Sequence, residues 1–344
     1  MVIDFSKLNR TELEDFIKEK SMNISAAQDL MDFCFYSGNS LDKIRNLPDF
    51  LNLNLNDDEE RYYYESRIKP AIKQIESSDY DNNYYRKNIV PKPFKGDGYQ
   101  LTYLRFKPYQ CFPYDDIDID KDFVETSKIG YFDKEFSYLA VLKDDVVWMS
   151  TDPNEINTMK QPILEAKGHV LAFGLGLGYF PLMTALKEEV NDVTIIEKDP
   201  KIISIFKKHI LPLFEKKEKI HVIEGDAFEY AMRVDKKYNY IFVDIWHNPE
   251  DGLPMYLKLY PLLEKTSAKV VYWLEKSILA MYRRCLMTIF EEALLGYTEK
   301  NYKKSENEYD DIINGLFYKF SDTGFKSVHD IKQILQDNNL KKLI

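Results

Sequence analysis

Cysteine and histidine are both scarce in this chain of 344 residues, which has three cysteines and five histidines. The cysteines lie far apart, at positions 34, 111 and 285, and their odd number argues against a disulfide framework and for a reducing compartment. The histidines show no metal-ligand spacing, so we expect no metal site. The opening residues, MVIDFSK, lack the basic segment and apolar run of a signal peptide, so we expect a cytoplasmic protein.

Positive charge is also in deficit, since 47 Lys and Arg face 57 Asp and Glu, a formal net charge of −10. Binding to duplex nucleic acid needs a basic face, so we expect no nucleic-acid partner and favour a cationic or neutral small substrate. One stretch without charged side chains, residues 168–186, approaches the length of a membrane span. Its three closely spaced glycines favour a strand, a turn and a helix instead, and we expect no membrane association.

The first part of the chain divides into two regions. Residues 1–90 have helical patterning and are expected to form a helical N-terminal domain. We expect helices at residues 26–36, 41–51 and 57–77, preceded by a helix with a capping box formed by Thr11 and Glu14. Residues 91–160 are expected to form a loop and β-hairpin region, with a strand at 99–106 and a hairpin of 136–142 with 146–150.

Four aspartates alternate with other residues in this second region, at positions 116, 118, 120 and 122. A calcium loop needs glycine at its sixth position and glutamate at its twelfth, and neither register that starts here provides them. The pattern therefore favours a solvated acidic edge. The alternative is that these acids steer a cationic substrate.

Residues 161–320 alternate strands and helices, a pattern that indicates an α/β fold with a Rossmann-like, doubly wound parallel sheet. Strands are expected at residues 169–173, 193–197, 220–224, 240–244 and 268–274, and helices at 178–187, 200–213, 227–234, 253–264 and 277–295. Residues 312–320 are expected to add an edge strand. A C-terminal helix, at residues 328–340, is expected within the last segment, 321–344.

The strongest local signal is the sequence F-G-L-G-L-G-Y at residues 173–179, directly after a strand and opening a helix. Glycines at 174, 176 and 178 let the chain turn sharply and let a ligand approach the backbone. Glu197 follows the second strand, where an acid can accept both hydroxyls of a ribose, and Asp226 with Ala227 follows the third, where they could contact an adenine edge. A tight turn and ordinary strand-end acids are the structural alternative.

The end of the fourth strand carries the candidate catalytic residues. Asp244 is the candidate general base, or the residue that anchors an amine substrate. The alternative is that Asp244 is a structural acid beside a bound cofactor. His247 could exchange a proton near neutral pH, or it could be an exposed loop histidine. Trp246 could stack on the ring of a substrate or on adenine, or it could simply pack in the core. Glu155 is a further candidate, because it could approach the acceptor substrate.

These motifs resemble the class I S-adenosylmethionine-dependent methyltransferases, and over residues 128–280 they resemble the spermidine synthase family of aminopropyltransferases. The resemblance implies that the cofactor contacts Gly174, Gly176, Gly178, Glu197, Asp226 and Ala227. In the segment D-P-N-E-I-N-T-M, residues 152–159, the first and last positions fit the family motif. Ile156 stands where that family has a tyrosine, Asn157 where it has a histidine, and His247 where it has a second acid.

We therefore expect an S-adenosylmethionine-dependent, methyltransferase-like enzyme that acts on a small-molecule acceptor, which could be cationic. The first alternative is a spermidine-synthase-like aminopropyltransferase that uses decarboxylated S-adenosylmethionine. The second is a cofactor-binding or scaffold protein that has lost catalysis, as the three altered positions would suggest. The N-terminal helices could form a lid or the contact of a homodimer.

Overall fold

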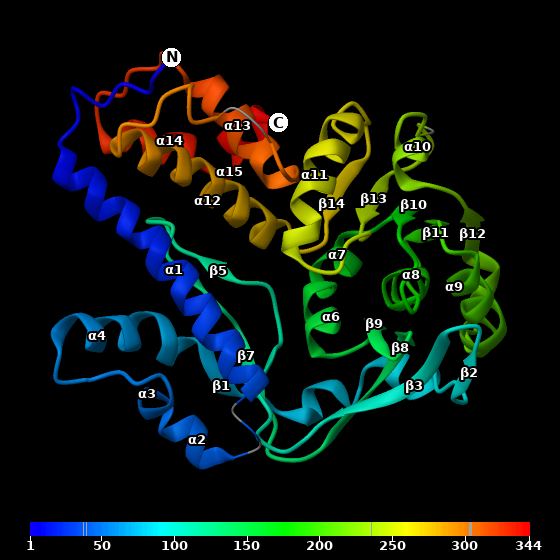
Figure 1. Ribbon diagram of the computed structural model, residues 1–344. Coiled ribbons are helices and arrows are strands. Elements are labelled where there is room, and N and C mark those ends of the chain that lie inside the picture. The colour runs from blue at the N-terminus through cyan, green and yellow to red at the C-terminus, as the bar shows by residue number, and fades with distance from the viewer. Residues whose placement is uncertain (37, 39, 235, 303–304) are drawn as a thin grey trace.

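The computed structural model of the protein describes residues 1–36, 38, 40–234, 236–302 and 305–344 (Figure 1). Its centre is a five-stranded parallel sheet in the order β12-β11-β10-β13-β14. The strands are β10 (Gly168–Phe173), β11 (Val190–Glu197), β12 (Ile220–Glu224), β13 (Tyr240–Val243) and β14 (Lys269–Tyr272). This order starts in the middle, runs to one edge and returns to the other side, so the expected Rossmann-like fold class is confirmed.

Helices follow each of these strands, as the alternation predicted. They are α8 (Tyr179–Ala185), α9 (Pro200–Ile205), α10 (Ala227–Ala231), α11 (Pro249–Leu263) and α12 (Glu275–Leu294). After α9 the chain stays helical, through a π-helical turn (Phe206–Ile210) and a 3-10 turn (Leu211–Leu213). The uncharged stretch forms β10, the glycine turn and α8, and no helix of the described residues has the length and apolarity to cross a membrane.

A four-stranded antiparallel sheet precedes the central sheet, in the order β2-β3-β8-β9. It consists of β2 (Phe94–Gly96), β3 (Tyr99–Phe106), β8 (Phe136–Lys143) and β9 (Val146–Ser150). The predicted strand and hairpin are both confirmed, and the hairpin turns through Asp144 and Asp145, whose φ angles are 51° and 63°. Two short helices, α6 (Pro153–Thr158) and α7 (Lys160–Glu165), then lead into β10.

The N-terminal region is helical, but its boundaries differ from those expected. The first two expected helices are one helix, α1 (Arg10–Tyr36), because residues 10–36 contain neither glycine nor proline. The expected capping box is also wrong. Helix α1 begins one residue before Thr11, and the side chain of Asn9 accepts hydrogen bonds from the N–H groups of Thr11 and Glu12.

The remaining N-terminal elements are short. Helices α2 (Leu41–Arg45), α3 (Leu47–Phe50) and α4 (Asp58–Tyr63) are followed by a π-helical turn (Tyr64–Ile68) and a 3-10 turn (Lys69–Ala71). The helix expected to reach residue 77 therefore ends at Ala71, next to Pro70, and β1 (Ile72–Gln74) follows. Strand β1 pairs with β7 (Ile129–Tyr131), which also pairs with β4 (Phe112–Pro113). Helix α5 (Tyr84–Asn88) and the pair β5 (Asp118–Ile119) and β6 (Glu125–Thr126) complete this part.

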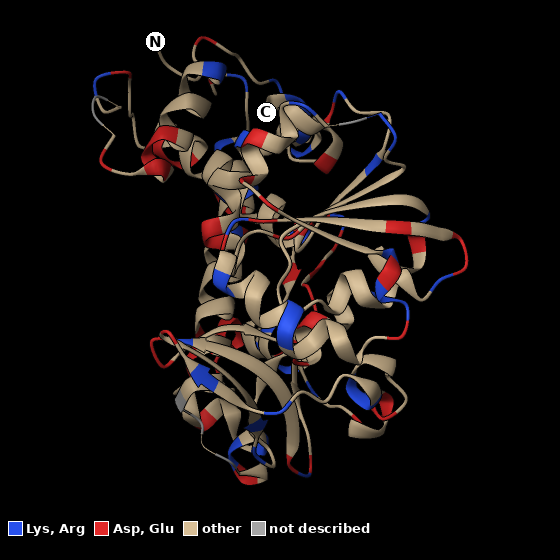
Figure 2. Ribbon diagram, turned by 90° about the vertical axis from the view of Figure 1, so that its right-hand side faces the viewer, with Lys and Arg blue, Asp and Glu red and all other residues tan. Residues whose placement is uncertain are grey.

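The two ends of the chain lie together in one layer (Figure 1). Helix α1 packs on α12 and on α14 (Val328–Ile334), and Lys20 of α1 forms an ion pair with Glu291 of α12. The helix expected at residues 328–340 is divided into α14 and α15 (Asp337–Leu340). The division of the chain at residues 90, 160 and 320 stays a prediction. In Figure 2 basic and acidic segments are interspersed, and the expectation of no nucleic-acid partner also stays a prediction.

One expected strand is wrong. Residues 312–320 lie in helix α13 (Glu308–Phe320). Apolar residues at 312, 313, 316, 317 and 320 follow helical spacing, and Leu316, Phe317 and Phe320 are buried on one face. The side chain of Asn307 accepts hydrogen bonds from the N–H groups of Tyr309 and Asp310, which fixes the first turn.

Replacing this cap tests the helical assignment. Asn307→Ala should lower the free energy of unfolding by about 0.5–2 kcal/mol, because two N–H groups lose their acceptor. Asn307→Asp, which keeps the acceptor, is the control and should remain close to the wild type in urea denaturation. Equal stability of all three proteins would contradict a capped helix at this position.

Candidate active site

The glycine turn between β10 and α8 has all three glycines in the left-handed region, with φ angles of 93°, 53° and 79° at Gly174, Gly176 and Gly178. A Cβ atom on Gly174 would lie 1.8 Å from the carbonyl oxygen of Asp244, and one on Gly178 would lie 2.4 Å from the ring of Phe206. A Cβ on Gly176 would meet nothing within 4 Å. Close packing therefore explains the outer two glycines, and Gly176 faces open space.

That open space belongs to a cavity of about 970 Å³ at the carboxyl ends of the central strands. Its wall includes every expected site residue except Gly178: Gly174, Gly176, Glu197, Asp226, Ala227, Asp244 and His247. Gly178 begins α8 and packs against Phe206 instead of lining the cavity. The parallel strands end at this edge of the sheet, which is where open α/β sheets bind ligands.

Glu197, the last residue of β11, holds the glycine turn in place. Its Oε2 accepts a hydrogen bond of 3.1 Å from the N–H of Leu175, and its Oε1 accepts one of 2.8 Å from the N–H of Asp199. Burial raises the pKa of this carboxyl, against the lowering effect of those N–H groups. Each oxygen keeps a second lone pair, so Glu197 can also accept hydroxyl groups from a ligand.

Asp226 and Ala227 line the cavity at the start of α10. The Oδ1 atom of Asp226 accepts hydrogen bonds from the N–H groups of Phe228, at 2.8 Å, and Glu229, at 3.1 Å. This cap explains an acid at the end of β12 without any ligand. The expected contact with adenine stays a prediction, which the position on the cavity wall allows.

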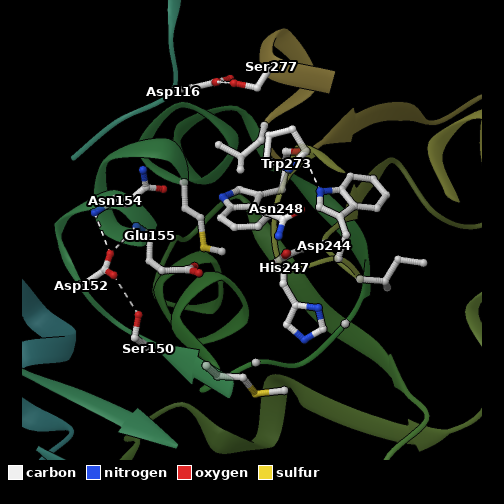
Figure 3. Close-up of a pocket in the computed structure, with 18 of the residues that line it drawn as sticks. Asp116, Ser150, Asp152, Asn154, Glu155, Asp244, His247, Asn248, Trp273 and Ser277 are labelled. Atoms are coloured by element: carbon white, nitrogen blue, oxygen red, sulfur yellow. Dashed lines mark hydrogen bonds between the residues drawn. The ribbon is translucent and has the colours of Figure 1, made fainter. Parts of the chain in front are cut away.

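Two half-buried carboxylates lie near each other on the cavity wall, Asp244 after β13 and Glu155 in α6 (Figure 3). Burial raises the pKa of Asp244 to about 7, and the charge of Glu197 adds to the shift. The pKa of Glu155 is raised well above its ordinary value, first by burial and then by the charges of Asp244 and Asp152. Among the described residues, neither carboxylate has a Lys or Arg ion-pair partner, so this cavity can stabilise a cation.

Helix α6 places Glu155 through its own cap. The Oδ1 atom of Asp152 accepts hydrogen bonds from the N–H groups of Asn154, at 2.8 Å, and Glu155, at 3.2 Å, and Ser150 donates to its Oδ2 at 3.0 Å. These bonds fix the first turn of the helix, and Figure 3 shows the side chain of Glu155 on the same side as Asp244 and His247. Burial raises the pKa of Asp152 as well.

His247 lies on the cavity wall between two elements. A hydrogen bond of 2.9 Å joins its Nδ1 to Oδ2 of Asp251, and its ring meets Trp148 of β9 edge to face, with the centroids 4.3 Å apart. Trp246 packs instead of projecting freely. Its Nε1 donates to the carbonyl of Trp273 at 3.1 Å and its ring lies against Gly252, although it also lines part of the cavity.

Two of the residues that depart from the spermidine synthase motif do not line the cavity. Ile156 is 1% exposed and belongs to the hydrophobic core. The amide of Asn157 donates hydrogen bonds of 2.8 Å to the hydroxyl of Tyr80 and to the carbonyl of Tyr114. Neither residue lines the cavity, so both have structural roles here.

The acidic edge expected at positions 116–122 is partly wrong. Asp118, Asp120 and Asp122 are exposed, but Asp116 lines the cavity, where the hydroxyl of Ser277 donates to it. Burial raises the pKa of Asp116. No group of three or more metal-binding side chains occurs in the described part of the chain. No pattern of the sequence links Asp116 to Ser277, because 161 residues separate them.

The cavity also contains residues from outside the predicted set. Lys143 and Trp148 come from the β8–β9 hairpin, and Leu30 and Met31 come from α1. The hairpin could be predicted from the sequence. Which of its two faces lines the cavity could not. The N-terminal helices were expected as a lid or a dimer contact, and α1 forms part of the cavity wall.

The glycine turn gives a direct test of this packing. Gly174→Ala should lower the free energy of unfolding by about 3 kcal/mol or more, because its Cβ would overlap the carbonyl oxygen of Asp244. Gly176→Ala should cost about 1–2 kcal/mol, the strain of a left-handed alanine without an overlap. Similar losses for the two variants in urea denaturation would contradict the close approach at Gly174.

The buried carboxylate makes stability depend on pH. The pKa of Asp244 is about 7 in the folded protein and near 3.8 ordinarily, so the native state binds more protons between these values and its stability falls as pH rises through this window. Asp244→Asn should therefore be more stable than the wild type at pH 7.5, by on the order of 4 kcal/mol. Below pH 4 the two proteins should converge in thermal denaturation. A constant difference across this range would exclude the raised pKa.

Comparisons with known proteins found similarity to solved structures alone. No protein-family model and no curated protein matches the chain. Among solved structures, a spermidine synthase from Thermotoga maritima is 13% identical, with a TM-score of 0.32, and the match covers 44% of this chain and 58% of that one. A spermidine synthase in complex with the transition state analogue AdoDATO is 14% identical, with a TM-score of 0.33, and the match covers 44% and 60%. The chain thus matches less than two thirds of the length of either synthase.

Proposed function

We propose that the protein is a transferase that binds an adenosyl sulfonium donor in this cavity and transfers a carbon group from it to an amine. The observation that carries the proposal is the pair of half-buried carboxylates with raised pKa values, Asp244 and Glu155, beside a glycine turn that leaves open space at Gly176. A sulfonium and an ammonium are both cations, and two neighbouring carboxylates without ion-pair partners are complementary to both.

The residues on the wall fit an adenosyl group. Gly176 leaves room for the donor to approach the backbone, and a Cβ atom would project into that room. Glu197 would accept the hydroxyls of the ribose with its remaining lone pairs. Asp226 and Ala227, at the next strand end, would contact the adenine edge.

The chemistry requires an amine with a free lone pair. The donor supplies an electrophilic carbon. The new C–N bond forms as the C–S bond breaks. The electron pair of the broken C–S bond remains on sulfur, which leaves as part of a neutral thioether. Asp244 would take the proton that the amine loses, because a carboxylate with a pKa near 7 can accept it and release it near neutral pH. Glu155 would hold the amine in line with the donor.

The charges favour a donor without a carboxylate. The glycine turn meets Asp244 directly, so a donor chain beside this turn would lie close to Asp244 and Glu155. A terminal ammonium suits these acids, whereas the carboxylate of S-adenosylmethionine would be repelled by them. Decarboxylated S-adenosylmethionine, and hence aminopropyl transfer, is therefore the better-supported form of the reaction.

One observation favours methyl transfer as the second candidate. Lys143 lines the cavity and has no acidic ion-pair partner among the described residues, and its Nζ lies 4.4 Å from the ring centre of Trp148. This cation could receive the carboxylate of S-adenosylmethionine. The two candidates differ in which donor binds more tightly.

Calorimetric titration with both donors tests the proposal. Decarboxylated S-adenosylmethionine should bind more tightly than S-adenosylmethionine, and Glu197→Ala should weaken its binding by about 1–3 kcal/mol, because buried hydrogen bonds are lost. Glu224→Ala is the matched control, since Glu224 pairs with Glu197 in the register of β11 and β12 but is exposed and outside the cavity.

Each outcome of this titration has a separate meaning. Tighter binding of S-adenosylmethionine would select methyl transfer. Tight binding without transfer to any amine would select a protein that binds the donor but has lost catalysis. Unchanged affinity in Glu197→Ala would exclude the ribose contact, and no binding of either donor would refute the proposed function.

A further inference from the structure

The cavity wall also includes residues of α1 and α12, away from the carboxylate pair. They are Leu30 and Met31 of α1, and Ser277 and Met281 of α12. Asp116, in the segment before β5, lies at the same end of the cavity, where the hydroxyl of Ser277 donates a hydrogen bond to it. Figure 3 shows Asp116 and Ser277 together, set apart from the group of Glu155, Asp244 and His247. We call this region the far compartment.

The cavity wall is rich in flexible and aromatic apolar side chains. Five of the ten methionines of the chain line it, at positions 31, 149, 159, 255 and 281, and so do all three tryptophans, at 148, 246 and 273. The indole N–H groups of Trp246 and Trp273 already donate, to the carbonyl of Trp273 and to the hydroxyl of Thr158. What these residues offer a ligand is therefore mainly apolar surface, and methionine adapts that surface to irregular shapes.

Most charges at the end of the far compartment neutralise one another. Asp115 pairs with Lys128, and Arg284 pairs with Glu125. Asp116 has no ion-pair partner in the described residues. Its Oδ1 accepts hydrogen bonds from the hydroxyl of Ser277 and, at 2.8 Å, from the N–H of Ile117. Its remaining lone pairs provide a hydrogen-bond acceptor without an ion-pair partner at this end of the cavity.

From these walls we infer that the acceptor is an amine on an elongated apolar body, which lies in the far compartment and ends in a hydrogen-bond donor at Asp116. The inference rests on the proposed function, because it takes Asp244 and Glu155 as the place of the reacting amine. A chain with charges along its length would bring them against Leu30, Met31 and Met281 without partners, which is unfavourable. An apolar chain instead gains binding energy along the same wall.

The first measurement is how affinity depends on the length of the carbon chain of the amine. It is made by calorimetry on the protein with propylamine, hexylamine and octylamine. Each methylene placed against the apolar wall should tighten binding about two- to fourfold, the size of the transfer free energy of that group. Butane-1,4-diamine should bind more weakly than hexylamine, because its second charge would lie in apolar surroundings. Affinity that is independent of chain length, or strongest for the diamine, would overturn the inference.

Two variants test whether the apolar chain of the amine lies in the far compartment. Met281→Gln should weaken octylamine about 5- to 30-fold and leave propylamine unchanged, and Met232→Gln, at a surface position 69% exposed and outside the cavity, is the control. Asp116→Ala should remove the advantage of 8-aminooctan-1-ol over octylamine, because the terminal hydroxyl loses its acceptor. Equal effects of Met281→Gln and Met232→Gln would overturn the placement.

The donor titration separates failure of this inference from failure of the proposed function. If the donor binds but the amines show no dependence on chain length, the acceptor assignment alone fails. If neither donor binds, the proposed function fails and this assignment fails with it. Because every readout is a binding constant for a defined amine, the natural acceptor need not be identified for the test to decide.

Discussion

The close approach of the glycine turn to the end of β13 is the constraint on which the site depends. The backbone at Gly174 passes so near the carbonyl of Asp244 that no side chain fits between them. Glu197 holds the next residue of the turn through the N–H of Leu175. Three neighbouring strand ends are thereby fixed relative to one another, and the acids that follow them converge on one cavity. Without this contact the same residues would still lie at one edge of the sheet, but not around a common space.

The site stores unfavourable electrostatic energy. Asp152, Glu155, Asp244 and Glu197 all have raised pKa values, and burial is the first cause of each. Desolvated carboxylates without cationic partners destabilise the folded protein, and a large hydrophobic core must compensate for them. A bound cation would recover part of this energy. The same feature that weakens the fold thus provides affinity for a sulfonium or an ammonium.

The N-terminal helix closes the cavity on the side away from the sheet. Ion pairs join α1 to α12 through Lys20 and Glu291, and α12 to β6 through Arg284 and Glu125. Asn23 of α1 donates to the carbonyl of Phe123 and accepts from the N–H of Glu125. These contacts hold Leu30 and Met31 against the cavity, so a helix with no recognisable motif completes the wall.

Local sequence was sufficient for the central fold and for most of the site residues. Buried strands separated by helical segments give a parallel sheet, and the carboxyl ends of its strands must share one edge, so Glu197, Asp226, Asp244 and the glycine turn could be placed together. The boundaries of α1 and the helix at residues 312–320 were predicted wrongly although local signals existed: residues 10–36 contain neither glycine nor proline, and the apolar residues of 312–320 follow helical spacing. Which glycine faces open space, the burial of Asp116 beside Ser277 and the contribution of α1 were decided only by the tertiary structure. These contacts join residues far apart in the chain, and side-chain periodicity carries no information about such partners.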